Sequence, residues 1–346
     1  MNGERNYSID TFKFFAALSV VGIHAQPFAN LEQSIYQNIY FILRVLFSFA
    51  VPFFFMSSGY LLCRGINKTK DKKIYILRYL KKISMILVTT LICYIIFNLF
   101  KFILSSNPTE NIKSLFYSIF KLRNIYYGID EGGMFHLWYL FAVIYIVILL
   151  YLFNNRTNQL FFISIFLHVI GNWIQIKNVG INTRDALFYG LFYTMLGYYM
   201  CDNEAFIRSK ISKISQINLI FLLFISNIIE ILEAYLMTSR TYYFSTILVS
   251  ISIFLIIIKN KNILKNSYIN QIGKDCLGIY LIHVMMLDTI YLFIIKLNLS
   301  NLTNRLIWNI MITPAVFVIS WIIYIIIKQL VNKIKVKNIK SSIVVE

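Results

Sequence analysis

Apolar runs of about 20 residues recur along the whole chain, and they constrain its fold more than any other feature. A hydrocarbon core about 30 Å thick requires a helix of roughly this length. We expect ten spans, near residues 9–26, 39–63, 76–104, 136–153, 159–176, 185–201, 216–236, 241–259, 271–296 and 305–331. The sequence therefore predicts an all-α, polytopic integral membrane bundle of about ten transmembrane helices.

The composition leaves little material for a water-facing surface. Of 346 residues, 58% are hydrophobic and only 14% are charged, whereas a soluble domain is about one quarter charged. The connectors between the apolar runs are short, which leaves no room for a second globular domain. We expect a ten-helix membrane domain over residues 1–335 and a short basic cytoplasmic tail over residues 336–346.

The formal net charge of +18 reflects topology and does not indicate a nucleic-acid partner. Lys and Arg cluster in every second connector, as cytoplasmic loops require, and they also face anionic lipid headgroups. An even number of spans with both termini cytoplasmic satisfies this rule throughout. The abundance of Ile, Asn and Lys is typical of an AT-rich bacterial genome. We expect a multi-pass protein of the bacterial plasma membrane, with the lipid bilayer as its first partner.

The first span carries three ionisable side chains that the bilayer would ordinarily exclude. Asp10, Lys13 and His24 lie on one helix, and eleven residues place Lys13 and His24 about 16 Å apart on nearly the same face. Ionisable groups inside a span mark candidate functional sites. The alternatives are a helix cap for Asp10, a snorkelling Lys13 and an interfacial His24 satisfied by water.

Polar groups recur within the second, fourth and ninth spans. Pro52 removes a backbone hydrogen bond in the second span, and the Ser-Ser-Gly run that follows permits close approach of another helix or a ligand. The alternatives are a kinked packing interface in the second span and an aromatic belt in the fourth. In chain order, the candidate residues of these spans are Arg44, Ser58, Tyr60, His136, Trp138, Tyr280 and His283.

Taken in order, these motifs resemble those of the membrane acyltransferase-3 family. The pattern Arg5…Ile9-Asp10…Lys13…His24 is similar to the family's first helix. The resemblance covers nearly the whole chain. The later matches are Pro52…Ser58-Gly59-Tyr60, His136-Leu137-Trp138-Tyr139-Leu140, Phe192…Gly197 and Gly278-Ile279-Tyr280-Leu281-Ile282-His283.

The resemblance implies transfer of an acyl group, usually acetyl, from cytoplasmic acyl-CoA to a hydroxyl of a cell-envelope glycan or similar acceptor. The family's essential histidine corresponds to His24, and its basic partner corresponds to Lys13, where the family usually has Arg. The family's Arg-x-x-Arg corresponds to Arg78-Tyr79-Leu80-Lys81, again with one Arg replaced. Acyl-CoA, with acetyl-CoA as the usual case, is then a co-substrate. We expect neither a permanently bound cofactor nor a metal ion.

The residue chemistry is compatible with that activity. A neutral imidazole at His24 can accept a hydroxyl proton as the oxygen attacks the thioester. Donors to the oxyanion could come from Ser58, Tyr60 or a protonated His136. His283 completes the expected catalytic set.

Two further sets of residues are expected to bind the substrates. The phosphates of CoA suit a basic cluster at the cytoplasmic mouth of the bundle, for which topology alone is the alternative explanation. This cluster consists of Lys73, Arg78, Lys81 and Lys82. The other expected substrate-binding residues are Arg44, Trp138 and Tyr280.

A transport function is the second hypothesis. The His-Leu-Trp-Tyr-Leu motif is also similar to the membrane half of the serine racemases of vancomycin resistance, which is linked to serine uptake. Polar groups on spans one, two, four and nine could line a path for serine or another small molecule. The oligomeric state stays open, with a homodimer as one alternative.

Overall fold

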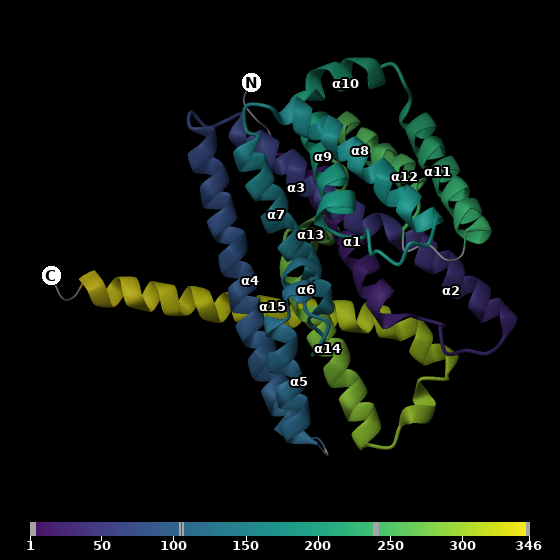
Figure 1. The fold of residues 1–346 in the computed structure, drawn as a ribbon, viewed down its shortest axis with the longest axis vertical. Coiled ribbons are helices and arrows are strands. Elements are labelled where there is room, and N and C mark those ends of the chain that lie inside the picture. The colour runs from purple at the N-terminus through teal and green to yellow at the C-terminus, as the bar shows by residue number, and fades with distance from the viewer. Residues whose placement is uncertain (1–4, 104, 106, 238–241, 344–346) are drawn as a thin grey trace.

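The computed structural model describes residues 5–103, 105, 107–237 and 242–343, and all regular structure within these residues is helical (Figure 1). The predicted all-α fold is confirmed. The elements are α1 (Tyr7–Ala25), α2 (Ser34–Leu46), η1 (Phe47–Phe49), α3 (Ala50–Ile66), α4 (Lys72–Ile103), α5 (Pro108–Phe120), α6 (Leu122–Tyr127), η2 (Met134–Leu137), α7 (Trp138–Leu152), α8 (Thr157–Ile176), η3 (Ala186–Gly190), α9 (Leu191–Asp202), α10 (Glu204–Ile211), α11 (Gln216–Leu236), α12 (Thr246–Lys259), α13 (Tyr268–Gly273), α14 (Cys276–Lys296), η4 (Ser300–Leu302) and α15 (Leu306–Ile343).

Every predicted span coincides with a helical segment. The spans expected at 185–201 and 241–259 coincide with shorter helices, η3 followed by α9 in one case and α12, of 14 residues, in the other. The expected end points 104 and 241 lie outside the described residues.

The chain is a multi-pass membrane protein. Among the described residues, eight helical stretches are long and apolar enough to cross a bilayer, namely Tyr7–Ala25, Ser34–Ile66, Lys72–Ile103, Met134–Leu152, Thr157–Ile176, Gln216–Leu236, Cys276–Lys296 and Leu306–Ile334.

The shortness of α12 has a local cause. The helix begins only at Thr246, because a carboxylate of α11 holds the residues before it. Glu233 accepts hydrogen bonds from the backbone N–H groups of Phe244 and Ser245 at 2.9 and 2.8 Å. Such bonds satisfy N–H groups that have no partner within a helix. Hydropathy alone does not distinguish this polar start from the first turn of a span.

The outer faces of the long helices are apolar, as a lipid environment requires. Large side chains such as Met85, Phe162 and Ile217 are exposed. Such a surface is unfavourable in water and is the expected surface in hydrocarbon. The spans differ in how deeply they are enclosed, since 61% of the apolar window of α1 is buried, against 22% for α11. Helix α1 is therefore central and α11 peripheral.

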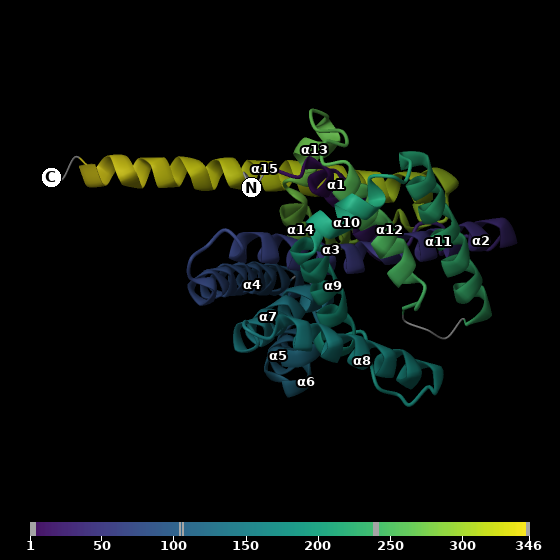
Figure 2. The same cartoon turned by 90° about the horizontal axis from the view of Figure 1, so that it is seen from above.

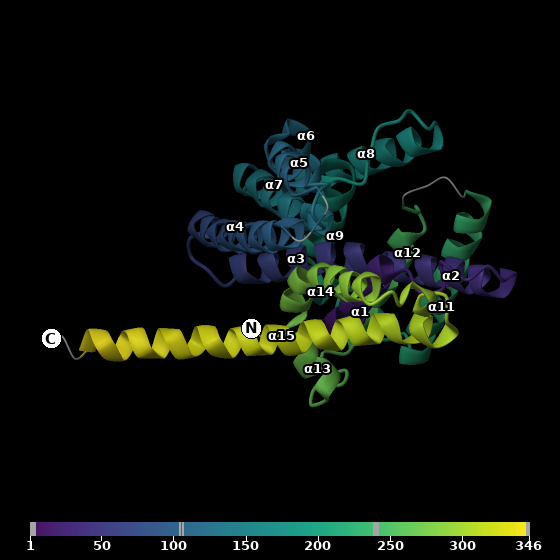
Figure 3. The same ribbon diagram turned by 90° about the horizontal axis from the view of Figure 1, so that it is seen from below.

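The described part of the bundle has two large apolar cores and a small third cluster of Val45, Ala234 and Tyr243. Seen from above and below, α1, α13 and α15 lie on one side of α3, and α7, α8 and α9 lie on the other (Figures 2 and 3). One core joins α1, α14 and α15 through residues such as Val21, Ile279 and Val316. The larger core joins α3, α4, α7, α9 and α12. Residues of α1 belong to both cores, so this helix links the two halves of the bundle.

Two glycines hold α3 against α9. A side chain at Gly59 on α3 would overlap the carbonyl oxygen of Thr194, and one at Gly197 on α9 would overlap the carbonyl oxygen of Met56. Each helix therefore supplies a glycine at the point where the backbone of the other passes. This reciprocal contact is the close packing that small residues permit between membrane helices. We call it the glycine seam.

The last helix extends well beyond the bundle. In all three views the C-terminal half of α15 projects away from the other helices (Figures 1–3). The helix continues to Ile343, so residues 336–343 of the expected tail are helical and continuous with the last span. Residues 344–346 lie outside the described part of the chain.

Candidate active site

Three histidines from three separate elements meet in the bundle. His24 is in the last turn of α1, His136 is in η2 directly before α7, and His283 is on α14. The ring centroids are 6.3 Å apart for His24 and His136, 5.2 Å for His24 and His283, and 5.1 Å for His136 and His283. The sequence predicts each residue separately, and the fold brings them together.

Local backbone structure fixes the position of His136. Gly132 and Gly133 precede it with φ values of +65° and +71°, a region that glycine adopts at little cost. The His136 Nδ1 lies 3.0 Å from the carbonyl oxygen of Gly133, and its Nε2 lies 3.3 Å from the hydroxyl of Tyr94. The hydroxyl of Tyr280 donates to the His136 carbonyl. Both ring nitrogens therefore have partners, and the residue is held at side chain and backbone.

His283 presents an unpaired acceptor to the cluster. Its Nδ1 lies 2.7 Å from the carbonyl oxygen of Tyr280, one turn earlier on α14. A carbonyl oxygen only accepts, so Nδ1 carries the proton and Nε2 of the neutral ring is the acceptor. That Nε2 is buried and has no hydrogen-bond partner among the described residues. Buried polar groups normally find partners, and a hydroxyl or a second histidine would satisfy this one.

A cavity of about 160 Å³ adjoins the cluster. Four predicted site residues line it, namely His24, His136, Trp138 and Tyr280. The walls are mainly aromatic and aliphatic, and histidine, tyrosine and arginine supply the polar groups. We call it the histidine cavity. Its full lining is Val20, Ile23, His24, Val51, Phe54, Phe135, His136, Trp138, Tyr139, Arg184 and Tyr280.

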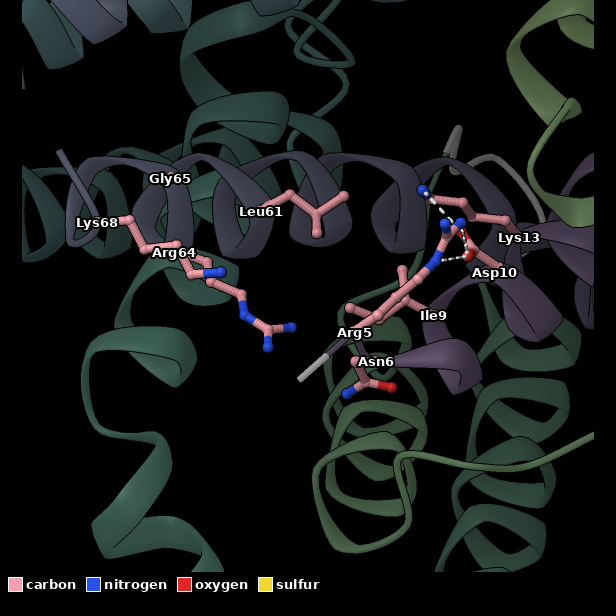
Figure 4. A pocket seen from close by; sticks show the side chains of 9 residues that line it. All are labelled: Arg5, Asn6, Ile9, Asp10, Lys13, Leu61, Arg64, Gly65 and Lys68. Atoms are coloured by element: carbon pink, nitrogen blue, oxygen red, sulfur yellow. Dashed lines mark hydrogen bonds and ion pairs between the residues drawn. The ribbon is translucent and has the colours of Figure 1, made fainter. Parts of the chain in front are cut away.

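A second pocket, with a volume of about 400 Å³, lies at the other end of α1. Figure 4 shows Asp10 between two cations, with Arg64 and Lys68 of the α3 end across the pocket. Arg5 Nη2 lies 2.6 Å from Asp10 Oδ2, and Lys13 Nζ lies 3.5 Å from Asp10 Oδ1. Cationic side chains outnumber carboxylates in the lining of this pocket, so we call it the basic pocket. It is lined by Arg5, Asn6, Ile9, Asp10, Lys13, Leu61, Arg64, Gly65 and Lys68.

Helix α1 connects the two sites. It begins at Tyr7, where the side chain of Asn6 accepts a hydrogen bond from the N–H of Ser8, and it runs unbroken to Ala25. Lys13 lines the basic pocket and His24 lines the histidine cavity, with about 16 Å of helix between them. A ligand that occupied both sites would therefore run alongside this helix.

Comparison with known families identifies the type of protein. A family model for an acyltransferase domain, that of acyltransferase family 3, matches residues 6–325, which is nearly the whole chain. The chain belongs to acyltransferase family 3. In this family member, the three clustered histidines and Lys13 all fall within the matched region.

Two curated relatives of this acyltransferase-3 protein are amino-acid racemases of Enterococcus faecalis. One is 28% identical over 232 residues, covering 61% of this chain and 30% of the relative. The other is 33% identical over 137 residues, covering 39% of this chain and 18% of the relative. The chain thus spans less than a third of the length of either curated relative. No solved structure matches the chain.

Besides Lys13 and His283, three predicted catalytic or substrate-binding residues of the acyltransferase-3 protein do not line the histidine cavity. Tyr60 donates a 2.6 Å hydrogen bond to Glu204 of α10, and Arg44 is exposed on α2. The Ser58 hydroxyl is hydrogen bonded at 2.9 Å to that of Tyr139, which lines the histidine cavity. Ser58 is therefore connected to the cavity through one side chain, whereas Tyr60 and Arg44 do not line it.

The predicted CoA-binding residues lie along the first turns of α4. Arg78, Lys81 and Lys82 are exposed, and Lys73 Nζ lies 5.8 Å from the centre of the Tyr151 ring. None of the four lines the basic pocket, whose cations come from the N-terminal segment, α1 and the end of α3. Two groups of cations are therefore available for an anionic donor.

Arg184 lines the histidine cavity, and the sequence patterns do not single it out. It lies between α8 and η3, with its guanidinium carbon 5.7 Å from the centre of the Trp138 ring. In the sequence it stands next to Asp185, so the pair resembles ordinary charges at the end of a span. The only sequence feature that could have indicated a functional role for Arg184 is its position in a connector that the charge pattern places on the outer side of the membrane.

Proposed function

We propose that the chain is an acyl-CoA-dependent O-acyltransferase of the bacterial plasma membrane. It moves an acyl group, with acetyl as the expected case, from cytoplasmic acyl-CoA to a hydroxyl of a cell-envelope glycan or similar acceptor. Membership of acyltransferase family 3 supports acyl transfer. The donor, the acceptor and the residue roles below are our proposals.

Helix α1 places a histidine cluster and a basic pocket at its two ends, and this arrangement carries the proposal. The phosphates of CoA are anionic, and Arg and Lys side chains are their usual protein partners. The thioester of acyl-CoA lies at the far end of the flexible pantetheine arm. A donor with its phosphates in the basic pocket and its arm along α1 would bring the thioester towards His24. The cations of α4, including Arg78 and Lys81, would flank the donor as it arrives from the cytoplasm.

The proposed reaction uses His24 as the general base. Its imidazole accepts the proton of the acceptor hydroxyl while the oxygen attacks the thioester carbonyl. The carbon–sulfur bond then breaks, and the departing thiolate takes the proton from the imidazolium, so that an ester and free CoA result. Nε2 of His283 can accept a hydrogen bond from the protonated His24. The Tyr139 hydroxyl at the cavity wall is the proposed donor to the oxyanion. It would exchange its 3.2 Å hydrogen bond to the Phe54 carbonyl for one to the oxyanion, while Ser58 donates to it.

The test of this proposal is transfer by purified protein in nanodiscs. Labelled acetyl-CoA is supplied with a panel of hydroxyl acceptors, and both acetyl ester and free CoA thiol are measured. We expect wild-type protein to form acetyl ester and free CoA thiol in equal amounts. We expect the His24→Ala variant to form neither product. A well-folded wild-type protein that releases no thiol with any acceptor would contradict the proposal.

Transport of serine or another small molecule is the second candidate function. The His-Leu-Trp-Tyr-Leu motif supports it, and the match to amino-acid racemases bears on it only through the amino acid in their name. The polar groups of the histidine cavity would then line the transport path. Uptake of labelled serine by proteoliposomes distinguishes the two functions, because transport predicts accumulation that requires no acyl-CoA, whereas acyl transfer predicts none.

The proposed direction of transfer requires a defined topology. A reporter fused after Glu346 should be cytoplasmic, and one inserted near Asn107 should be external, because basic connectors alternate along the chain. Enzymatic or fluorescent reporters active on one side of the membrane measure this. An external C-terminus would place the basic pocket on the wrong side of the membrane for a cytoplasmic donor.

A further inference from the structure

We infer that Arg184 binds a carboxylate of the ligand in the histidine cavity, and that the acceptor is a small hydroxyl compound carrying this group. The inference rests on the proposed function where it names the ligand as the acceptor. The anion contact itself is independent of acyl transfer. It therefore has a test of its own.

The backbone around Arg184 is fixed on both sides. The Thr183 hydroxyl donates to the carbonyl oxygen of Gly171 at 3.2 Å. Oδ1 of Asp185 accepts hydrogen bonds from the N–H groups of Leu187 and Phe188 at 3.0 and 2.8 Å. Both neighbours are thus engaged with the protein itself, and Arg184 between them is held at the cavity wall. A side chain placed in this way is suited to bind a ligand in a fixed geometry.

The charge of Arg184 has no counter-ion among the described residues. Its neighbour Asp185 is engaged elsewhere, since Oδ1 caps η3 and Oδ2 accepts from Tyr126 at 3.2 Å. The Nε of Arg184 is buried and has no hydrogen-bond partner in the described part of the chain. The cation–π contact with Trp138 compensates only in part. Arg184 as a whole is half-buried, so its guanidinium is only partly removed from water. A ligand anion would supply the missing counter-ion and a partner for the buried Nε.

The chemistry of the cavity restricts the ligand further. Its eleven lining residues include no Asp or Glu, so it favours an anion over a cation. The guanidinium fork matches a carboxylate through two parallel hydrogen bonds. A volume of about 160 Å³ is well below the roughly 300 Å³ at which drug-sized pockets begin. A small hydroxy acid, or one acidic sugar at the end of a glycan, is the size that this cavity accepts.

The placement of Arg184 beside the histidines gives the carboxylate a role in orientation. Arg184 and His24 line the same cavity, and Arg184 comes from a connector that the charge pattern places outside the membrane. A ligand held by its carboxylate would have its hydroxyl restricted to the reach of the imidazole. Such positioning accelerates a transfer reaction, because the two reacting groups no longer have to find each other.

Ligand-induced thermal stabilisation in nanodiscs tests the anion contact without requiring turnover. Three pairs of compounds differ by one carboxylate: glycerate and glycerol, L-serine and serinol, glucuronate and glucose. We expect wild-type protein to be stabilised by at least one carboxylate member and by none of the neutral members. Arg184→Gln should weaken that apparent affinity roughly 10- to 100-fold, as loss of a charge-assisted hydrogen-bonded pair implies.

Two further variants separate recognition from folding and from total charge. Arg184→Lys keeps the charge but lacks the fork, so we expect an intermediate affinity. Arg305→Gln removes an exposed arginine directly before α15 and should bind like wild type. Equal stabilisation by both members of all three pairs, no stabilisation by any of them, or an unchanged affinity in Arg184→Gln would overturn the inference.

Acetyl transfer to the same compounds separates this inference from the proposed function. If Arg184→Gln raises KM for carboxylate acceptors and leaves kcat nearly unchanged, Arg184 binds the ground-state acceptor, as expected. If kcat falls equally for neutral and carboxylate acceptors, Arg184 acts on the transition state and the inference is wrong. Arg184-dependent binding of carboxylates without any transfer would refute the acyltransferase proposal and leave the anion contact standing.

Discussion

The two ends of α1 present opposite environments along one unbroken helix. In the basic pocket the charges are partly exposed, with the Arg5 and Lys13 side chains 53% and 20% accessible, and Asp10 balances them. At the histidine cavity His136 is only 2% exposed and the adjoining His283 is fully buried, while His24 is half-buried. Solvated charges suit reversible binding of an ionic group, whereas a largely buried site strengthens hydrogen bonds and electrostatic interactions. In the proposed reaction, this chain therefore separates holding the donor from reacting with it.

The largest effect is expected at the histidine end. His24→Ala should reduce transfer about 10²- to 10⁴-fold, the usual contribution of a general base, with little change in the apparent affinity for acyl-CoA. Turnover per folded molecule is the measurement, with a melting curve for each variant. His168→Gln is the matched control, because His168 is buried against Phe192 and lines neither site. Near-normal turnover of the His24→Ala protein would show that the histidine end of α1 does not carry the reaction, and the proposed division between the two ends would then be wrong.

Lys13 should give the next largest effect. Lys13→Ala leaves Asp10 paired with Arg5 alone and makes the basic pocket less positive. We expect the KM for acyl-CoA to rise about tenfold, comparable to loss of one hydrogen bond to a charged group. Lys13→Arg keeps the charge and should retain most of the activity. Equal loss in both variants would show that the lysine acts through its shape and not through its charge.

Paired double variants compare the two groups of cations. Arg64→Ala with Lys68→Ala changes the basic pocket, and Arg78→Ala with Lys81→Ala changes the exposed face of α4. Both pairs should weaken apparent donor affinity a fewfold. The pocket pair should do so more strongly, because Arg64 is half-buried whereas Arg78 and Lys81 are both exposed and therefore screened by salt. Donor KM at low and high ionic strength measures this difference. A larger effect of the α4 pair would move the donor site out of the basic pocket.

The smallest effect concerns stability near the C-terminal end of α3. Burial raises the pKa of the Glu204 carboxyl, but hydrogen bonds from Lys261 and Tyr60 outweigh it and lower the pKa below its ordinary value of 4.5. A carboxylate with a lowered folded pKa contributes stability above the unfolded pKa and loses it as pH falls through the folded value. Glu204→Gln should therefore lower the unfolding free energy at pH 7 by about 1 kcal/mol.

Melting curves as a function of pH provide the check on Glu204. The difference between wild type and Glu204→Gln should be constant above about pH 5.5. It should shrink as pH falls below about 4.5 and through the lowered pKa of the folded carboxyl. A difference that stays constant down to about pH 3 would mean that the substitution acts through packing and not through charge.

Hydropathy is sufficient to predict the helices, because each span must be apolar for about 20 residues whatever its neighbours are. It overestimates the length of the span near 241–259, since the polar turn held by Glu233 depends on a contact between two helices. Motif order gives His24, His136 and His283, and their position within apolar helices indicates function. That the three rings meet cannot be derived in this way, because it depends on how α1, η2 and α14 pack.

Arg184 and the basic pocket mark the limit of prediction from one sequence. The charge of Arg184 is visible, but its neighbour Asp185 looks like its partner, and only the fold directs that carboxylate to cap η3. The basic pocket combines Arg5, Lys13 and Arg64, which come from different elements of the chain. Residue spacing predicts only which side chains lie together within one helix. It therefore predicts the run of cations on α4, but it cannot predict that cations from different elements meet in the basic pocket.

The glycine seam restricts how the bundle can move. Because Gly59 and Gly197 each admit the backbone of the opposite helix, α3 cannot slide along α9 by one residue without a steric clash. The two helices must therefore travel as one rigid body. Any opening of the histidine cavity then has to come from the other elements that line it, namely α1, η2 with the start of α7, α14 and the connector that carries Arg184. Crosslinking α3 to α9 would therefore leave such an opening intact.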